Sequence, residues 1–167
     1  MRKFWIIGIC IMLLSGCGAQ ETFEHVSDAD TTPVMSQQSS RVSIKLPDEA
    51  AVPAMENEHA GSIYLCDGYT VCVQTTAAGD LNRTFLDNTG FPKESLTVME
   101  TQQNGVKRYD CVWTSAGEGE EQVCRGVILD DGSFHYVVTV MTNASDAERF
   151  AQQANAILGS VSLVSTD

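Results

Sequence analysis

Four strand-like segments separated by glycine-containing turns dominate the second half of the chain. The segments are Ser95–Gln102, Val106–Ser115, Glu120–Leu129 and Ser133–Thr142. The turns between them are Asn104-Gly105, Gly117-Glu118 and Asp131-Gly132, each with the glycine that tight hairpins favour. Consecutive strands joined in this way predict an antiparallel meander.

The last of these segments carries apolar side chains on both faces. One face has Phe134, Tyr136, Val138 and Val140, and the other has His135, Val137, Thr139 and Met141. A strand with one face in water alternates apolar and polar residues, which this segment does not do. We therefore expect Ser133–Thr142 to be a central strand that is covered on both sides.

A first helix is predicted from Asp80, which serves as its N-cap, through Asn88. Gly90 follows at the position where glycine commonly ends a helix. The residues expected on its buried side are Leu81, Phe85 and Leu86.

A second helix is predicted over residues 146–158. Ser145 and Glu148 have the spacing of a capping box, and Gly159 ends the helical pattern. The apolar residues that share one face at helical spacing are Phe150, Ala151, Ala154, Ile157 and Leu158.

The remaining segments complete an α+β pattern. Alternating Val42, Ile44 and Leu46 before Pro47 predict a first strand, and residues 48–60 a loop with one helical turn. Two further strands, Ser62–Cys66 and Thr70–Thr76, flank an Asp67-Gly68 turn, and Ser160–Val164 is a short edge strand or an extended tail. We expect an antiparallel sheet of six or seven strands with two main helices packed on it, and no nucleotide-binding βαβ unit.

This element order resembles the PsbP-like group, named for an accessory protein of photosystem II. The likeness covers residues 41–164 and is clearest where Phe134–Thr142 runs into the helix at 146–158 and a final Ser-Val segment. The resemblance implies the fold but transfers no active site, because it carries no catalytic motif.

The N-terminus has the pattern of a bacterial lipoprotein signal. Arg2 and Lys3 precede an apolar stretch of residues 4–14, which is too short to span a bilayer. The sequence Leu14-Ser15-Gly16-Cys17 then resembles a lipobox, which implies cleavage before Cys17 and a diacylglycerol on its sulfur. Two acyl chains give stable membrane anchoring. The alternative is an ordinary secretory signal in which Cys17 is incidental.

Three parts of the chain follow from this pattern. Residues 1–16 are the signal peptide, residues 17–40 are the lipidated cysteine with a disordered tether, and residues 41–167 are a single globular domain. The net charge of −12 becomes −14 without the two cations of the signal peptide. Such a surface repels phosphate backbones, so nucleic-acid binding is not expected.

Four cysteines lie in the predicted domain. If Gly117-Glu118 form a two-residue hairpin turn, Cys111 is directly opposite Cys124 at a distance suited to a disulfide. Cys66 and Cys72 flank a shorter turn and pair similarly if residues 68–70 form the loop. An extracytoplasmic location permits both bonds, each contributing about 2–3 kcal/mol.

Three other roles are conceivable for these four cysteines. A zinc site is disfavoured because no closely spaced cysteine pair is present, and a thiol oxidoreductase because there is no C-x-x-C motif. Free thiols, as in an anaerobic organism, remain open. We expect no metal and no cofactor.

Candidate catalytic groups are few. His25, His59 and His135 form no metal-binding or nucleophile motif, and His135 near Asp130 and Asp131 is most simply an ordinary strand residue. Glu118, Glu120 and Glu121 are most simply a solvated turn, with weak calcium binding as the alternative. Tyr109, Cys111 and Trp113 share a strand face and predict core packing, with an aromatic ligand-binding surface as the alternative.

These observations predict a lipid-anchored extracytoplasmic protein that is not an enzyme. Its expected role is an interaction or accessory module for an envelope protein whose identity the sequence does not reveal. A small-molecule carrier with a pocket between sheet and helices is the alternative, and an enzyme with dispersed catalytic residues is a third. An exposed apolar patch would favour the first, a deep cavity the second, and titratable groups with strongly shifted pKa values the third.

Overall fold

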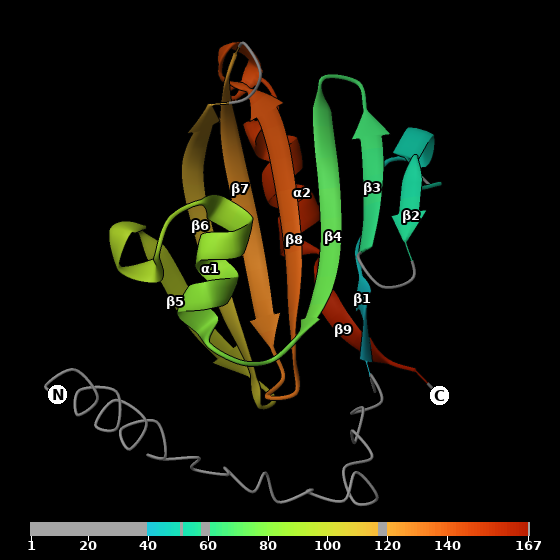
Figure 1. Cartoon of the computed structure of the whole chain (residues 1–167). Helices are drawn as coiled ribbons and strands as arrows, with labels where there is room; N and C mark the ends of the chain where they lie inside the picture. Colours follow the sequence, from blue (N-terminus) through green and yellow to red (C-terminus); the bar gives the residue numbers. More distant parts are fainter. Residues whose placement is uncertain (1–39, 51, 58–60, 117–119, 167) are drawn as a thin grey trace, which may run out of the picture. The chain divides into compact units, whose positions relative to one another are not determined.

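Seven antiparallel strands form the main sheet, in the spatial order β2-β3-β4-β8-β7-β6-β5 (Figure 1). The strands are β2 (Met55–Asn57), β3 (Gly61–Cys66), β4 (Tyr69–Ala77), β5 (Val98–Gln103), β6 (Val106–Ala116), β7 (Glu121–Asp130) and β8 (Phe134–Asn143). The predicted α+β class, the meander of the last four strands and the central place of β8 are confirmed. β2 was not predicted and lies within the segment interpreted as a loop.

The computed structural model describes residues 40–50, 52–57, 61–116 and 120–166, which fall within one compact unit. The signal peptide, Cys17 and the tether up to residue 39 lie outside the described residues. In the part of the chain that is described, no helix is long and apolar enough to span a membrane.

A separate two-stranded sheet joins the two ends of the domain. β1 (Ser40–Ser43) pairs antiparallel with β9 (Ser162–Ser165). The first strand therefore begins and ends earlier than predicted, and the final segment is a strand and not a tail. Val42, Ile44 and Leu163 pack against the core on one side of the main sheet.

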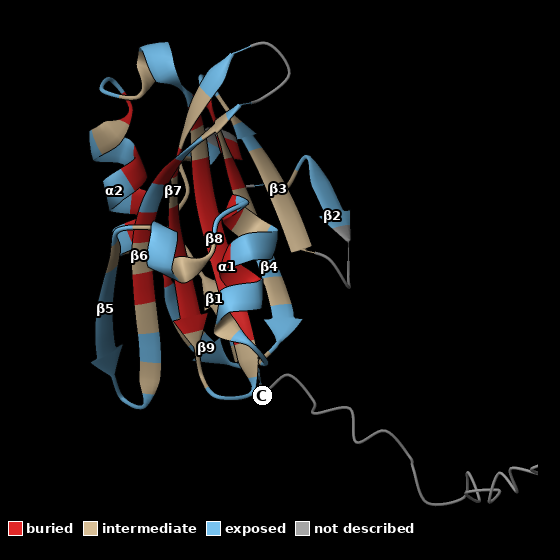
Figure 2. Ribbon diagram, turned by 60° about the vertical axis from the view of Figure 1, so that its left-hand side comes forward, coloured by how far each residue is buried: buried red, intermediate tan, exposed pale blue. Residues whose placement is uncertain are grey.

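The sheet separates two apolar cores, and the alternation of side chains along β8 connects them. Tyr136, Val138 and Val140 face the core beneath α2 (Ala151–Gly159), whereas Val137 faces the core beneath α1 (Leu81–Thr89). Figure 2 shows the buried residues concentrated on the central strands. Both faces of β8 are buried, as its sequence predicted.

The first helix forms as its sequence predicted. The Asp80 carboxylate accepts a hydrogen bond from the N–H of Asn82 at 3.0 Å, and Gly90 adopts a left-handed φ of 79° at the C-terminal end. Phe85 is fully buried beneath α1, but Leu86 is 43% exposed, so its predicted burial is wrong. Thr84 occupies the buried position instead.

The second helix starts later than its sequence predicted. Residues Ala144–Asp146 form a 3₁₀ turn, and α2 begins only at Ala151 after Phe150, which makes no side-chain capping bond. The capping box of Ser145 and Glu148 is therefore wrong. The predicted apolar face of the helix is confirmed, because Phe150, Ala154, Ile157 and Leu158 are buried.

Two further 3₁₀ turns lie elsewhere in the chain, at Asp48–Ala50 and Lys93–Ser95.

Candidate functional site

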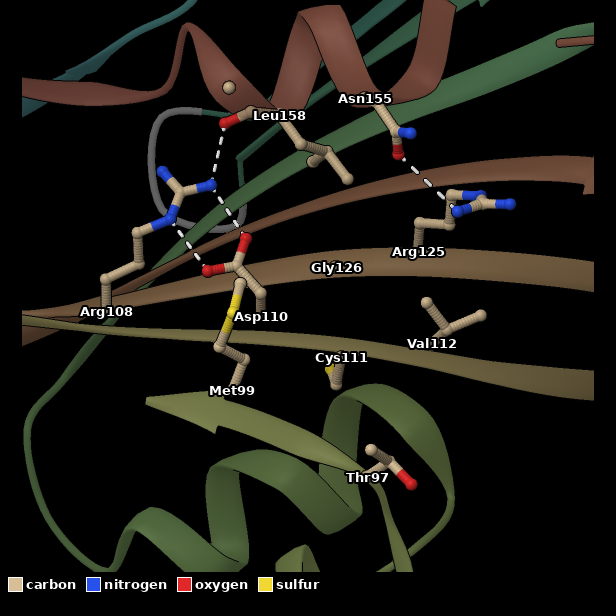
Figure 3. A pocket seen from close by; sticks show the side chains of 11 residues that line it. Thr97, Met99, Arg108, Asp110, Cys111, Val112, Arg125, Gly126, Asn155 and Leu158 are labelled. Atoms are coloured by element: carbon tan, nitrogen blue, oxygen red, sulfur yellow. Dashed lines mark hydrogen bonds and ion pairs between the residues drawn. The ribbon is translucent and has the colours of Figure 1, made fainter. Parts of the chain in front are cut away.

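A groove on one face of the sheet lies between α2 and the strands β5, β6 and β7 (Figure 3). It has a volume of about 450 Å³, and we call it the α2 groove. The residues that line it include Met99, Arg108, Asp110, Val112, Arg125, Asn155 and Leu158. The volume falls within the range of small-molecule sites, about 300–1,000 Å³.

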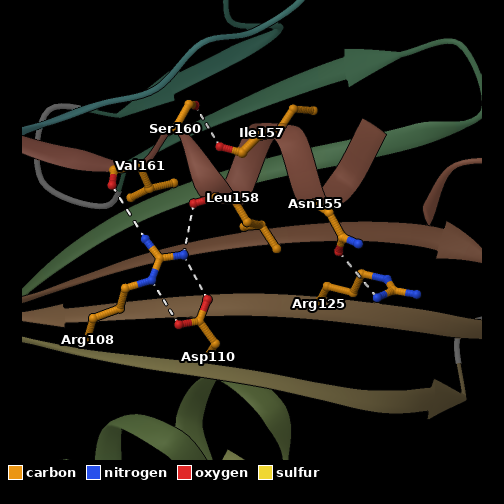
Figure 4. Close-up of polar contacts among 8 residues, drawn as sticks. All are labelled: Arg108, Asp110, Arg125, Asn155, Ile157, Leu158, Ser160 and Val161. Carbon is orange, nitrogen blue, oxygen red and sulfur yellow. Dashed lines mark hydrogen bonds and ion pairs between the residues drawn. The ribbon is translucent and has the colours of Figure 1, made fainter. Parts of the chain in front are cut away.

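An ion pair closes one end of the α2 groove. The Arg108 guanidinium donates to both carboxylate oxygens of Asp110, at 2.8 and 2.7 Å. It also donates to the Leu158 carbonyl at 3.0 Å and the Val161 carbonyl at 3.5 Å, where α2 ends (Figure 4). The Asp110 charge is therefore neutralised, and the C-terminus of α2 is fastened to β6.

The other end of the α2 groove holds a cation without an acidic partner. Arg125 Nη1 lies 3.4 Å from the side-chain oxygen of Asn155 on α2 (Figure 4). Among the described residues, no carboxylate lies within 4.0 Å of the Arg125 guanidinium.

Apolar side chains lie between these two ends. Met99 on β5 is 62% exposed and Val112 on β6 is 50% exposed, while Leu158 on α2 is buried beside them. Val112 and Arg125 are direct cross-strand partners, so the cation adjoins the apolar strip. The groove thus combines an apolar floor with one positive charge that no described carboxylate pairs with.

A second hollow, of about 440 Å³, lies on the opposite face, beside the C-terminal end of α1. Its lining includes Cys72, Cys124, Met141 and Trp113. The pKa of Cys124 is raised to about 11, mainly by burial and further by the nearby Cys72. The pKa of Cys111 is also raised to about 11, mainly by burial and further by Asp110. These groups stay protonated near neutral pH, so neither is an activated nucleophile.

The strand registers contradict the predicted disulfide geometry. Ala116 pairs with Glu121, so four residues separate the strands and not two; Cys124 therefore lies opposite Trp113 and Cys111 opposite Gly126. The direct opposition of Cys111 and Cys124 is wrong, and both are free cysteines in the structure. The predicted turn, Gly117-Glu118, lies outside the described residues.

The Cys66–Cys72 pairing fails for a different reason. Cys66 pairs with Tyr69 and Cys72 with Ile63, so the turn contains only Asp67 and Gly68. This register puts the two cysteine side chains on opposite faces of the sheet, because side chains alternate along a strand. Cys66 packs against the core beneath α2, whereas Cys72 lines the hollow beside α1.

Among the elements that the structure describes, no helix covers β2, β3 and β4 on the α1 side of the sheet (Figure 1). Met55 on β2 and Leu65 on β3 are 66% and 63% exposed there, next to Ile63 and Cys72. We call this surface the open sheet face; its members are Met55, Ile63, Leu65, Thr70, Cys72, Gln74 and Thr76. None of these residues is charged.

A buried polar chain links α1 to the sheet. The Thr84 hydroxyl and His135 Nδ1 are 2.7 Å apart, and His135 Nε2 lies 3.9 Å from the Asp130 carboxylate. Thr84 is 7% exposed and His135 2% exposed. The arrangement resembles a hydroxyl–imidazole–carboxylate triad, but the Thr84 hydroxyl lies in the interface between α1 and the sheet. We therefore interpret His135 as a buried core residue whose hydrogen-bonding groups are satisfied.

The remaining residues singled out from the sequence are aromatic, cysteine, acidic and histidine residues. Tyr109, Cys111 and Trp113 are all less than 9% exposed in the core beneath α1, which confirms core packing. Glu120 and Glu121 are exposed, and the described residues contain no group of three or more acidic, histidine or cysteine ligands. His25, His59 and Glu118 lie outside the described residues.

Sequence reasoning missed the two arginines of the α2 groove. Arg108 and Arg125 are 17 residues apart, and only the pairing of β6 with β7 and the position of α2 bring both to one groove. One signal was available. Arg125 is the one polar side chain in the run from Val123 to Leu129.

No protein-family model matches the chain, and no curated protein matches it. Among solved structures, the chain is similar to LpqN, which is described as involved in cell envelope biogenesis of Mycobacterium tuberculosis. The TM-score is 0.50 at 10% identity, over 78% of this chain and 87% of LpqN. At this identity the likeness concerns the fold alone.

Proposed function

We propose that this protein is a lipid-anchored cell-envelope protein whose domain binds another envelope protein and catalyses no reaction. Lipid on Cys17 would hold it at the extracytoplasmic face of a bacterial membrane. The observation that carries the proposal is the open sheet face, where Met55 and Leu65 are exposed with no charged neighbour on the same face of β2–β4.

The composition of the open sheet face supports docking of a protein. Interface cores are depleted of charged residues and enriched in methionine, and exposed apolar patches commonly mark interaction sites. The predicted mature chain carries a net charge of −14, yet this face carries none. A partner that covers Met55 and Leu65 therefore buries no charged side chain of β2–β4 on this face.

The location rests on two observations of different kinds. The lipobox Leu14-Ser15-Gly16-Cys17 favours lipidation, and the tether would let the domain reach a partner away from the bilayer. LpqN, a structural neighbour, is described as involved in cell envelope biogenesis. Membership of the PsbP-like group is part of the same proposal, supported by the element order.

A carrier for a small molecule is the second candidate, and the α2 groove favours it. The groove has the size of a ligand site and an apolar floor with few polar groups. An enzyme is less well supported. Thr84 borders a hollow beside α1 and is 7% exposed, but His135 is only 2% exposed, so a substrate has little access to the imidazole.

The test uses two matched double variants in the full-length protein. Met55→Lys with Leu65→Lys alters the open sheet face, and Met99→Lys with Val112→Lys alters the other face at similar exposure and with the same change of charge. Each protein is crosslinked in native membranes and its partners are identified by mass spectrometry. We expect the first pair to lose a partner that the wild type and the second pair retain.

Three outcomes count against the proposal. Equal partner recovery from both double variants removes the open sheet face as the docking surface. The absence of any reproducible partner in the wild type refutes the interaction role. A Cys17→Ser variant that fractionates with membranes as the wild type does refutes the lipid anchor.

A further inference from the structure

The charges of the α2 groove do not balance. Asp110 is neutralised by Arg108 through two hydrogen bonds, whereas the described residues offer Arg125 only a 3.4 Å contact with the neutral Asn155. The guanidinium has five N–H donors in a planar fork that matches a carboxylate. Arg125 therefore has most of its donors available for an anion that enters the groove.

Asn155 can assist Arg125 at the same end. Its amide has an oxygen acceptor and an NH₂ donor, and rotation about the terminal torsion exchanges the two. An anion bound to Arg125 would meet the NH₂ group of Asn155 from the α2 side (Figure 3). Two groups from different elements, β7 and α2, thus converge on one anionic position.

The apolar strip extends away from this position. Met99 pairs with Asp110 and Val112 with Arg125, so Met99 lies two strands and two residues from Arg125. With strands about 4.8 Å apart and a rise of about 3.4 Å per residue, the strip is roughly 12 Å long. This length suits a medium-length hydrocarbon chain.

The floor of the α2 groove disfavours an extended peptide. β6 pairs with β5 on one side and with β7 on the other, so its backbone N–H and C=O groups are used within the sheet. A peptide in the groove would bury its own backbone groups with few partners, which is unfavourable. A hydrocarbon chain has no such groups to satisfy.

We propose that the α2 groove binds a medium-chain carboxylic acid, with the carboxylate at Arg125 and Asn155 and the chain along Val112, Leu158 and Met99. The ion pair of Arg108 and Asp110 closes the far end, where the chain terminates. This site lies on the opposite face of the sheet from the open sheet face. It does not depend on the proposed protein partner.

Photo-crosslinking tests the site in the full-length protein in its membrane. The probe is decanoic acid with a diazirine at the end of its chain, and the labelled peptide is identified by mass spectrometry. We expect the label near Met99, because the carboxylate lies at Arg125. Unlabelled decanoate should compete for the site, whereas decanol, which lacks the carboxylate, should compete much more weakly.

Variants of Arg125 separate the charge from the packing. Arg125→Gln should reduce labelling at least about tenfold, since a hydrogen bond to a charged group is lost. Arg125→Lys should retain part of it. Arg83→Gln removes one positive charge from α1, which packs on the opposite face of the sheet from the α2 groove. This variant should be labelled as strongly as the wild type.

Several results would overturn the assignment. They are equal labelling of the Arg125→Gln and Arg83→Gln variants, equal competition by decanol and decanoate, and a main label outside the α2 groove. The double variant Met55→Lys with Leu65→Lys should label normally. Failure of the protein-partner proposal and failure of this one are therefore distinguishable.

Discussion

The Arg108 guanidinium binds both carboxylate oxygens of Asp110 and, at the same time, the Leu158 carbonyl at the end of α2. One side chain on β6 thereby neutralises the neighbouring carboxylate and donates a hydrogen bond to a carbonyl at the C-terminal end of α2. The last carbonyls of a helix lack partners within the helix, and a cation there is favourable. Together with the burial of Ile157 and Leu158, these bonds fix the C-terminal end of α2 and with it the shape of the α2 groove.

Arg108→Gln should lower the free energy of unfolding by about 2 kcal/mol, because charge-assisted hydrogen bonds to a partly buried acid are lost. Urea unfolding followed by tryptophan fluorescence measures the change. Arg83→Gln removes an exposed pair with Asp87 and should cost no more than about 0.5 kcal/mol. Equal effects of the two variants would show that Arg108 does not hold α2.

Gly126 is required by the packing of Trp113. A Cβ at residue 126 would lie 3.0 Å from the Trp113 ring, and Trp113 is only 8% exposed. Gly126→Ala should therefore destabilise the protein by about 1–3 kcal/mol through overpacking. Thermal unfolding measures the change.

Gly159 provides the matched control, because a Cβ placed there would have no atom within 4 Å apart from its chain neighbours and the backbone of its own helix. It is the last residue of α2, so Gly159→Ala should be neutral or should stabilise by up to about 1 kcal/mol. If both alanine variants unfold at the wild-type temperature, Trp113 is not packed as the structure has it.

Local signals in the sequence were sufficient for most of the fold. Glycine-containing turns and apolar alternation located the meander, and Asp80 and Gly90 located the ends of α1, because these features act within a few residues. The register of β6 and β7 failed because it depends on the length of the turn. The composition Gly-Glu-Gly-Glu fits a two-residue turn as well as the observed four-residue connection.

The candidate sites were largely hidden from the sequence because they are formed by tertiary contacts. Arg125 and Asn155 meet only after α2 has packed on the sheet. The prediction of a capping box at Ser145 and Glu148 was wrong for a related reason, namely tertiary packing. Phe150 packs into the core and against Tyr69, and the helix begins only after it.

The cysteines provide a prediction about covalent structure. Alkylation of the unfolded protein without reductant should modify both Cys111 and Cys124. In the folded protein at about pH 8, both should react slowly with iodoacetamide, because burial is the main cause that raises their pKa to about 11. A disulfide-linked peptide containing Cys111 and Cys124 would contradict the register of β6 and β7.

Asp131 provides a pH-dependent test at the β7–β8 connection. Burial alone would raise its pKa, but hydrogen bonds from the Phe134 and Ser133 N–H groups and the Tyr136 hydroxyl lower it on balance. Since the unfolded pKa is about 3.9, the carboxylate stabilises the fold above that pH, and the contribution is lost as pH falls through the lower folded value. Asp131→Asn should lower the free energy of unfolding by about 1–2 kcal/mol near neutral pH. The difference from the wild type should shrink below about pH 4, whereas Asp87→Asn, at an exposed pair, should change little at any pH. Urea unfolding at a series of pH values measures both, and a constant difference between wild type and Asp131→Asn down to about pH 2 would contradict the lowered pKa.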